Sequence, residues 1–217
     1  MTPERWPLQW AAVLVDLDGT LVDSEPLWAD AARDLALAHG APWSTHDGHA
    51  IVGWGIPAIA DLVQERGVPL SQDAVVDALH DAVGARLAEH IPWRDGALEL
   101  LGAVRSTGRP CGLVTMSYRR LAELVVAAAP DGVFDVVVAG DDVSRAKPAP
   151  DAYVVAARAL GVDPRACVVV EDSPPGVTSA LTAGAHVFAV DPAQRVTAHP
   201  RVREATLTEV TELLGLA

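Results

Sequence analysis

The chain has 217 residues, half of them hydrophobic, which is sufficient for one large domain or for one domain with a smaller insert. Its formal net charge of −13 would repel a phosphate backbone and the sequence offers no basic stripe, so we do not expect nucleic acid as a partner. The protein could still bind a small anionic substrate if positive side chains are concentrated at the binding site.

The first predicted element is a strand at Ala11–Val15, followed by the sequence Asp16-Leu17-Asp18-Gly19-Thr20. An apolar run before a glycine turn is typical of a strand buried on both faces, and its carboxyl end lies at the sheet edge where α/β proteins bind ligands. Alternate strand residues point the same way, so Asp16 and Asp18 begin on one side before Gly19 turns the chain. Two carboxylates so close repel each other unless a cation or a proton lies between them. The stretch therefore predicts Mg²⁺ with covalent or acid/base chemistry.

Two alternatives apply to this stretch. A calcium-binding loop would need Asp or Asn at Thr20, glycine at Leu21 and glutamate at Leu27, and all three positions fail. An ordinary strand end with solvated aspartates is the other alternative, and it stays open on these residues alone.

A helical region follows from Ser24 to Ile91. We expect helices at Glu25–His39, Pro57–Arg66 and Ser71–His90, the last with Ser71 as its N-cap, and loops between them. No part of the region is typical of a strand. It is therefore expected to form a separate all-helical unit, residues 23–92, with hinges near Val22–Ser24 and Ile91–Arg94.

Two motifs in this region carry weak signals. The segment Gly53-Trp54-Gly55-Ile56-Pro57-Ala58 matches a dinucleotide fingerprint, but no strand precedes it and the acidic residue at the usual distance, Asp73, falls in a predicted helix. We do not expect a nucleotide cofactor. His46 and His49 flank Asp47 in a predicted loop, and a metal site there is a minor alternative because no third ligand has suitable spacing.

Strands and helices alternate in the remainder of the chain. The expected helices are Asp95–Ser106, Tyr118–Ala129, Asp151–Leu160, Pro174–Ala183 and Leu207–Leu214, and the expected strands are Cys111–Thr115, Val136–Ala139, Cys167–Val170 and Ala185–Val190. Apolar strands separated by helices of this size indicate a parallel sheet covered on both faces. Residues 1–22 and 93–217 are therefore expected to form an α/β core.

Three strand ends in this core carry residues suited to one phosphate group. Thr115-Met116-Ser117 begins a helix and offers a hydroxyl, backbone N–H groups and the positive end of the helix dipole. Glu171-Asp172-Ser173 offers oxygen ligands for a hard cation. Lys147 is the only lysine in the chain, although there are 15 arginines, and it precedes a rigidifying proline. We expect its compact positive charge to interact with both a phosphate and a nucleophile, and we do not expect a solvated surface lysine.

Four motifs occur in a characteristic order: Asp16-Leu17-Asp18-Gly19-Thr20, Thr115, Lys147-Pro148, and Glu171-Asp172-Ser173 with Pro175-Gly176 and Ala183-Gly184. In this order and spacing the chain resembles the haloacid dehalogenase superfamily over nearly its whole length. The resemblance is to the branch with a helical cap after the first motif, the C1 branch, which contains β-phosphoglucomutase-like and phosphoglycolate phosphatase-like phosphatases. It implies a Rossmann-like parallel sheet with helices on both faces and an inserted all-helical cap that acts as a mobile lid.

The resemblance also implies roles for these residues. Asp16 would be the nucleophile that forms an aspartyl-phosphate, and Asp18 would protonate the leaving group and then activate water. Thr115 with the adjacent Met116, and Lys147, would hold the phosphoryl oxygens.

The resemblance further implies Mg²⁺ as the cofactor. It would be held by Asp16, the Asp18 carbonyl and Asp172, with Glu171 nearby or acting through water. This agrees with the reading of the residues alone, since phosphoryl transfer needs mainly alignment and charge neutralisation.

Comparison with members of the superfamily excludes some of the reactions that they catalyse. Dehalogenase members usually lack the second aspartate of the first motif, so Asp18 argues against carbon–halogen chemistry, and the absence of a cap lysine removes the phosphonatase mechanism. We favour a phosphatase for a small phosphate monoester, such as a sugar phosphate, phosphoglycolate or a nucleotide-like ester. The alternatives are a phosphosugar mutase and, least expected, a non-catalytic phosphate binder. Mutase-like members carry a histidine at the place of Trp28 and an arginine at the place of Ile56, and this chain has neither.

Substrate specificity is expected to lie in the cap, where tryptophans are concentrated. Trp28, soon after the hinge, and Trp54, beside Gly53 in a loop, are expected to face a substrate with an apolar or stackable group. Trp43 is equally compatible with a core position.

The remaining features concern location and state. Cys111 and Cys167 both open apolar runs, so we expect buried free thiols and a reducing compartment. The segment Met1–Trp10 has no apolar core of a signal peptide, and no run approaches 18 apolar residues. No G-x-S-x-G elbow supports a serine hydrolase. We expect a cytoplasmic monomer with no membrane partner.

Overall fold

The structure, a computed structural model, describes residues 10–51, 53–190, 196 and 198–215. These residues form two units. A sheet unit contains the described residues up to Asp23 together with those from Trp93 onward, and a helical unit contains Ser24–Pro92.

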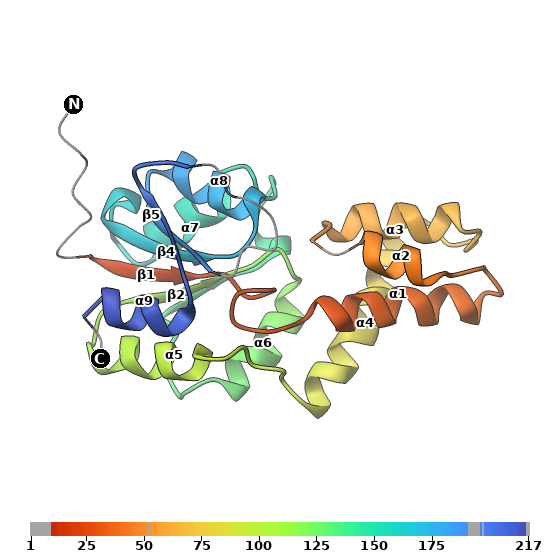
Figure 1. Cartoon of the computed structure of the whole chain (residues 1–217), viewed down its shortest axis with the longest axis horizontal. Helices are drawn as coiled ribbons and strands as arrows, with labels where there is room; N and C mark the ends of the chain where they lie inside the picture. The colour runs from red at the N-terminus through yellow and green to blue at the C-terminus, as the bar shows by residue number, and fades with distance from the viewer. Residues whose placement is uncertain (1–9, 52, 191–195, 197, 216–217) are drawn as a thin grey trace. The chain divides into compact units, whose positions relative to one another are not determined.

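The sheet unit is built on six parallel strands in the order β3-β2-β1-β4-β5-β6 (Figure 1). The strands are β1 (Ala12–Val15), β2 (Cys111–Val114), β3 (Val136–Val138), β4 (Cys167–Glu171), β5 (His186–Val190) and β6 (Val202–Ala205). Every residue of β1, β2 and β4 is buried, as expected for near-continuous apolar strands covered on both faces. In the register, Val13 of β1 lies opposite Cys111 on one side and Val168 on the other. The predicted parallel sheet is confirmed.

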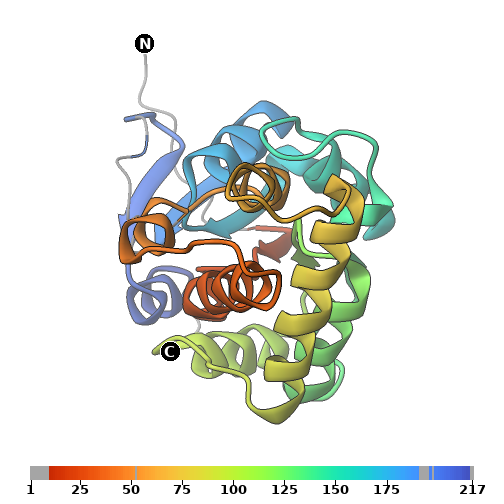
Figure 2. The same cartoon turned by 90° about the vertical axis from the view of Figure 1, so that its right-hand side faces the viewer.

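Helices cover both faces of this sheet. One face carries α5 (Ala97–Ser106), α6 (Arg119–Ala128) and α9 (Leu207–Leu213), and the other carries α7 (Asp151–Ala159) and α8 (Pro174–Ala183) (Figures 1 and 2). The strand order explains the division, since right-handed crossovers that run in opposite directions along the sheet place their helices on opposite faces. Short 3₁₀ turns occur at Gly140–Asp142 and Pro164–Ala166. The predicted helices of this unit are all present.

Strand β6 was not predicted from the sequence. Its four residues include Arg203 and Glu204, both exposed, so the segment lacks the apolar run that marks the other strands. It forms one edge of the sheet by pairing with β5, and charged residues are common on edge strands.

The helical unit contains α1 (Glu25–Ala38), α2 (Thr45–Ala50), α3 (Ile56–Glu65) and α4 (Gln72–Glu89). Helices α1, α3 and α4 pack on one another around a buried apolar core. The predicted N-cap of α4 is confirmed, because the Ser71 hydroxyl accepts a hydrogen bond from the amide of Ala74. No strand occurs among the described residues of this unit.

The prediction of a loop around His46 and His49 was wrong, because this segment forms helix α2. A capping box starts the helix: Ser44 Oγ accepts from the Asp47 amide while Asp47 Oδ2 accepts from the Ser44 amide. Arg66 also holds Asp47, with Nη2 2.5 Å from Oδ1, and these hydrogen bonds lower the pKa of Asp47. Because its carboxylate is committed to Arg66 and Ser44, the weak alternative of a metal site here has no support in the structure.

Two chain segments meet at the boundary of the sheet unit. Val22 forms an antiparallel bridge with Trp93, and the Arg94 amide donates to the Leu21 carbonyl. The segment that leaves the sheet unit and the segment that returns to it are therefore hydrogen-bonded side by side.

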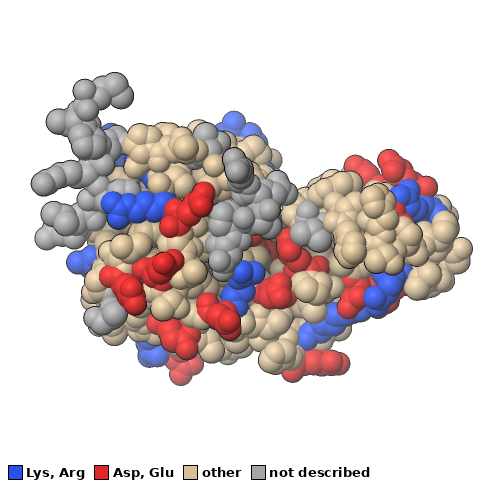
Figure 3. Space-filling view, in the orientation of Figure 1, with Lys and Arg blue, Asp and Glu red and all other residues tan. Residues whose placement is uncertain are grey.

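The surface charges are mixed. In the space-filling view, acidic side chains are scattered over the visible face of each unit with arginines among them, and no continuous basic stripe crosses the described part of that face (Figure 3). Among the described residues, no helix combines the length and apolar character needed to cross a lipid bilayer. Cys111 and Cys167 are buried free thiols as predicted, and burial raises the pKa of Cys111 to about 12.

Candidate active site

The site is built at the carboxyl end of β1. Asp16 follows the strand directly and is only 5% exposed. The predicted turn is confirmed, because Gly19 adopts a positive φ of 81° that other residues rarely take. A β-carbon at Gly19 would overlap Asp172 Oδ2, so glycine is also required for the close approach of this turn to the end of β4.

Lys147 is the central cation of the site. Its Nζ lies 2.5 Å from Asp16 Oδ1, 2.8 Å from Glu171 Oε1 and 3.0 Å from the Val114 carbonyl oxygen. An ammonium group has three protons, so all of them are used by these partners. The single lysine of the chain therefore lies in contact with Asp16, the predicted nucleophile.

Burial and charge act against each other in this cluster. Burial raises the pKa of Asp16 well above its ordinary value, and Lys147 is the neighbour that lowers it. Burial by itself would lower the pKa of Lys147, but Asp16 and Glu171 outweigh it and the pKa is raised. Asp16 and Glu171 therefore favour the charged form of Lys147, which supplies positive charge to a site that is otherwise acidic.

Three carboxylates meet beside this lysine. Asp16, Glu171 and Asp172 each offer an oxygen, and these atoms lie within 4.8 Å of one another. Burial, followed by the charge of Glu171, raises the pKa of Asp172 to about 7. Thr20 donates to Asp172 Oδ1 at 3.0 Å and orients the carboxylate.

This cluster fits a hard divalent cation. All three groups are oxygen ligands, which Mg²⁺ and Ca²⁺ prefer. Burial raises the pKa of Asp16 and of Asp172, and a cation beside them would favour their charged forms. Among the described residues, no other group of three potential ligands lies so close together.

Asp18 faces a different set of partners. Its Oδ2 accepts from the hydroxyl of Thr115 at 3.0 Å and from that of Ser117 at 2.8 Å. The Ser117 amide in turn donates to Thr115 Oγ1, which fixes the Thr115 side chain. Met116 supports Lys147, because its sulfur accepts from the Lys147 amide at 3.3 Å. The segment 115–117 therefore positions both the second aspartate and the lysine.

Some members of the site were missed at the level of sequence. Tyr153 on α7 is fully buried, and its hydroxyl lies 3.2 Å from Glu171 Oε1. A signal existed, because a buried tyrosine hydroxyl needs a partner and the predicted helix otherwise buries alanines. Ser173 donates to Glu171 Oε2 through its amide and hydroxyl, and Ser117 was identified only as part of a helix start.

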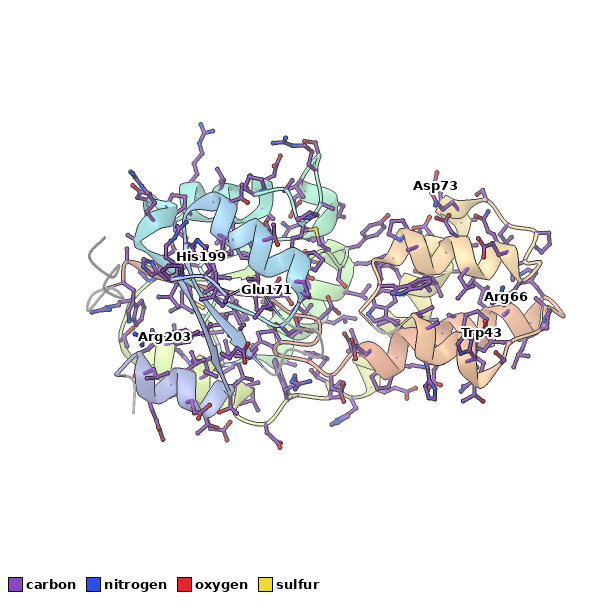
Figure 4. All side chains as sticks on the ribbon, turned by 45° about the horizontal axis from the view of Figure 1, so that its top comes forward. Trp43, Arg66, Asp73, Glu171, His199 and Arg203 are labelled. Atoms are coloured by element: carbon purple, nitrogen blue, oxygen red, sulfur yellow. The ribbon has the colours of Figure 1, made fainter. Side chains whose placement is uncertain are left out.

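The predicted substrate residues of the cap all lie in the helical unit. Trp54 is 44% exposed and Gly53 is exposed beside it. Trp28 is only 6% exposed and its ring lies edge-on to that of His80, with centroids 5.1 Å apart. It therefore belongs to the core of this unit, and its contact with a substrate stays a prediction. Figure 4 shows the half-buried Trp43 in the same unit, and Glu171 in the interior of the sheet unit.

The parallel sheet carries a buried aspartate, a lysine and an acidic cluster at its carboxyl edge, and a helical unit is inserted in the sequence after β1. Residues 10–184 match the haloacid dehalogenase-like hydrolase family, and the chain belongs to this family. The resemblance identified in the motifs is confirmed.

Several known proteins are similar to this chain. Hexitol phosphatase A of Escherichia coli is 36% identical over 207 residues, which cover 89% of this chain and 88% of that protein. The bifunctional riboflavin kinase/FMN phosphatase of Arabidopsis thaliana is 32% identical over 183 residues, and the match covers 83% of this chain but 48% of that larger protein. The crystal structure of CbbY from Rhodobacter sphaeroides in complex with phosphate has a TM-score of 0.81 at 26% identity, covering 93% and 96% of the two chains.

Proposed function

We propose that this protein is a Mg²⁺-dependent phosphatase that hydrolyses a small phosphate monoester through an aspartyl-phosphate on Asp16. The observation that carries the proposal is the buried contact between Asp16 and Lys147 beside the cluster of carboxylates. Relatives named hexitol phosphatase A, phosphorylated carbohydrates phosphatase and fructose-1-phosphate phosphatase support a phosphorylated sugar or sugar alcohol as the substrate.

In this proposal the reaction has two steps, transfer of the phosphoryl group to Asp16 and hydrolysis of the aspartyl-phosphate. In the first, a carboxylate oxygen of Asp16 bonds to phosphorus while the ester oxygen leaves, and Asp18 gives that oxygen its proton. In the second, Asp18 takes a proton from water, the water oxygen attacks phosphorus, and the bond to Asp16 breaks to release inorganic phosphate. Thr115 and Ser117 hold Asp18 between these proton transfers.

The cation would be held by Asp16, Asp172 and the backbone carbonyl of Asp18. When bound, it would neutralise phosphoryl charge and orient the phosphate against the nucleophile. Lys147 contributes a second positive charge on the same carboxylate of Asp16. Its direct contact with phosphate stays a prediction, since its three protons already have acceptors.

The helical unit favours a phosphatase over a mutase. A mutase needs a second cationic site for a bisphosphorylated sugar, and the arginines in Ser24–Pro92 are the strong cations that could provide one. Each is paired within the unit: Arg33 with Asp30 and Asp34, Arg66 with Asp47, and Arg86 with Asp34. With these charges already compensated, water is the expected acceptor.

Phosphate release from a panel of sugar and sugar-alcohol phosphates, phosphoglycolate and nucleotides tests this function. We expect turnover with Mg²⁺ and its loss after exhaustive chelation, because the acidic cluster would then repel an anionic substrate. Asp16→Asn should retain the fold and lose turnover. Full activity in chelator, or appreciable activity of Asp16→Asn, would show that the mechanism is wrong.

A second assay separates hydrolysis from phosphoryl transfer between sugar positions. The protein is incubated with β-glucose 1-phosphate, Mg²⁺ and a bisphosphate primer. We expect inorganic phosphate or no reaction. Catalytic accumulation of glucose 6-phosphate without stoichiometric phosphate would instead identify a mutase.

We further propose that Trp54 contributes to substrate choice, because it is a large apolar side chain left exposed between two glycines. Trp54→Ala should change the ratios of kcat/KM across the panel. Trp43→Ala, which alters a half-buried tryptophan of the same unit, is the matched control. Equal ratios for Trp54→Ala and the wild type would remove Trp54 from the specificity surface.

A further inference from the structure

The hydroxyl of Tyr153 has a role that packing alone does not explain. Tyr153 is fully buried on the face of α7 that packs against the sheet, where its buried neighbours on the helix are Ala152, Ala156 and Ala157. An apolar ring would fill this space equally well, yet the side chain carries a hydroxyl that lies 3.2 Å from Glu171 Oε1. The ring also lies under the lysine, with Lys147 Nζ 4.9 Å from its centroid. One side chain thus contacts both members of the Lys147–Glu171 pair.

Glu171 is held by a complete set of donors. Oε1 accepts from Lys147 Nζ and from the Tyr153 hydroxyl, and Oε2 accepts from the amide and the hydroxyl of Ser173. A carboxylate has about four lone-pair directions, and each of them is matched here by a donor. Glycine at position 176 completes the arrangement, because a β-carbon there would overlap the Glu171 carboxylate.

The neighbouring Asp172 is held differently. Thr20 donates to one of its oxygens, Oδ1, and its other oxygen lies against the backbone of Gly19, in the turn that carries Asp18. Glu171 is fully buried, whereas Asp172 is partly exposed. The two adjacent acids therefore differ as possible cation ligands. Both oxygens of Glu171 already accept hydrogen bonds from protein donors, whereas partly exposed Asp172 has an oxygen close to the carboxylate of Asp16.

We propose that Tyr153 is a positioning residue, whose hydroxyl fixes Glu171 as the counter-charge of Lys147 and so holds the lysine on Asp16. This role rests on the proposed phosphatase function only for its effect on turnover. In this arrangement Glu171 pairs with Lys147 and does not bind the cation. Asp16 and Asp172 are then the side chains that bind the cation. Without the hydroxyl, Glu171 Oε1 would accept only from Lys147. The Glu171 carboxylate could then rotate, and Lys147 would be held less firmly on Asp16.

The single lysine gives a direct way to test this. Isotope-labelled lysine produces one side-chain ammonium signal in the NMR spectrum of the whole protein, and that signal belongs to Lys147. Tyr153→Phe keeps the aromatic ring under the ammonium and removes only the hydroxyl. We expect the signal to shift and its protons to exchange faster with water. Tyr118→Phe, which removes the only other phenolic hydroxyl of the chain, is the matched control and should leave the signal in place.

Kinetics and cation binding complete the test. For Tyr153→Phe we expect kcat to fall by about tenfold, the scale of one hydrogen bond to a charged group, with KM and the Mg²⁺ dissociation constant within twofold of the wild type. Ser173→Ala, which removes a hydroxyl donor from the other oxygen of Glu171, should shift the same lysine signal and provides a second reading if Tyr153→Phe does not fold.

The outcomes are distinguishable. An unchanged lysine signal in both variants, or an unchanged kcat in Tyr153→Phe, would overturn the proposal. A change of Mg²⁺ affinity larger than the change of kcat would do so as well, because it would place Glu171 on the cation. If the wild type hydrolyses no phosphate ester while the lysine signal still responds to Tyr153→Phe, the positioning of Lys147 stands and the proposed phosphatase function fails.

Discussion

Replacing Lys147 with methionine would remove the positive charge between Asp16 and Glu171 and keep a side chain of similar length. The lysine nitrogen lies 2.5 Å from Asp16 Oδ1 and 2.8 Å from Glu171 Oε1, and all three side chains are at least 90% buried. Removing one partner from a buried ion pair costs about 3–5 kcal/mol, because the remaining charge is left without compensation. We expect the free energy of unfolding of Lys147→Met to fall by this amount at pH 8 in the presence of a chelator.

The loss should depend on pH, and its sign follows from protonation. Burial already raises the pKa of Asp16, and Lys147 is the neighbour that opposes this rise, so the pKa should rise further in Lys147→Met. A native state that holds more protons than the unfolded state loses stability as the pH increases. Lys147→Met should therefore be closest to the wild type near pH 5 and fall furthest below it at pH 8, by about 1.4 kcal/mol for each unit of added pKa shift.

A nearby arginine provides the control for this experiment. Arg145 pairs with Asp151 at 2.9 Å, but its side chain is 70% exposed, and exposed pairs contribute about 0–1 kcal/mol. Urea unfolding of Lys147→Met and Arg145→Met at pH 5 and pH 8, followed by circular dichroism, compares the two sites. The reasoning is refuted if Lys147→Met loses no more stability at pH 8 than Arg145→Met, or if it loses more in acid.

Three further changes test separate parts of the site. Because burial raises the pKa of Asp172 to about 7, the chelated protein should lose stability as the pH rises from about 4 to 7, and thermal unfolding of Asp172→Asn should lack this component. Ser117→Ala removes a hydroxyl donor to Asp18, the proposed acid, and should lower kcat by about tenfold with little change in KM, as measured by phosphate release. Gly176→Ala places a β-carbon on the Glu171 carboxylate and should lower the free energy of unfolding by about 1–3 kcal/mol. Gly102→Ala, at a helical glycine with open space around it, should raise the free energy of unfolding by about 0.5–1 kcal/mol. Equal melting temperatures for the two variants would contradict this.

The cluster at the carboxyl end of the sheet could be predicted because most of its residues follow buried strands. The carboxyl ends of parallel strands meet at one edge, so the aspartates after β1, Thr115 after β2 and Asp172 after β4 had to be neighbours. Lys147 was harder, because it lies in a loop beyond the turn Gly140–Asp142 and not at a strand end as expected. Its identification depended on its being the single lysine of the chain.

The parts that were missed depend on contacts between distant residues. Helix α2 contains two histidines and a glycine, which are poor helix formers, and Asp47 is held there by Arg66, 19 positions further along the chain. Strand β6 is a strand because β5 offers it an edge. The partner of the Tyr153 hydroxyl lies on another element, so the sequence could indicate that a partner exists but could not identify it.

The strand order also has a consequence for how the protein is made. Asp16 and Asp18 directly follow β1 and are synthesised early, but β1 can pair only after Cys111 and Val168, the residues opposite Val13, have also been synthesised. The helical unit contains contiguous residues, Ser24–Pro92, whose contacts are local, and it is complete before either of these strands leaves the ribosome. Non-local parallel pairing is slow to form. The nascent chain therefore carries an apolar first strand that has no partner strand until β2 and β4 have been synthesised.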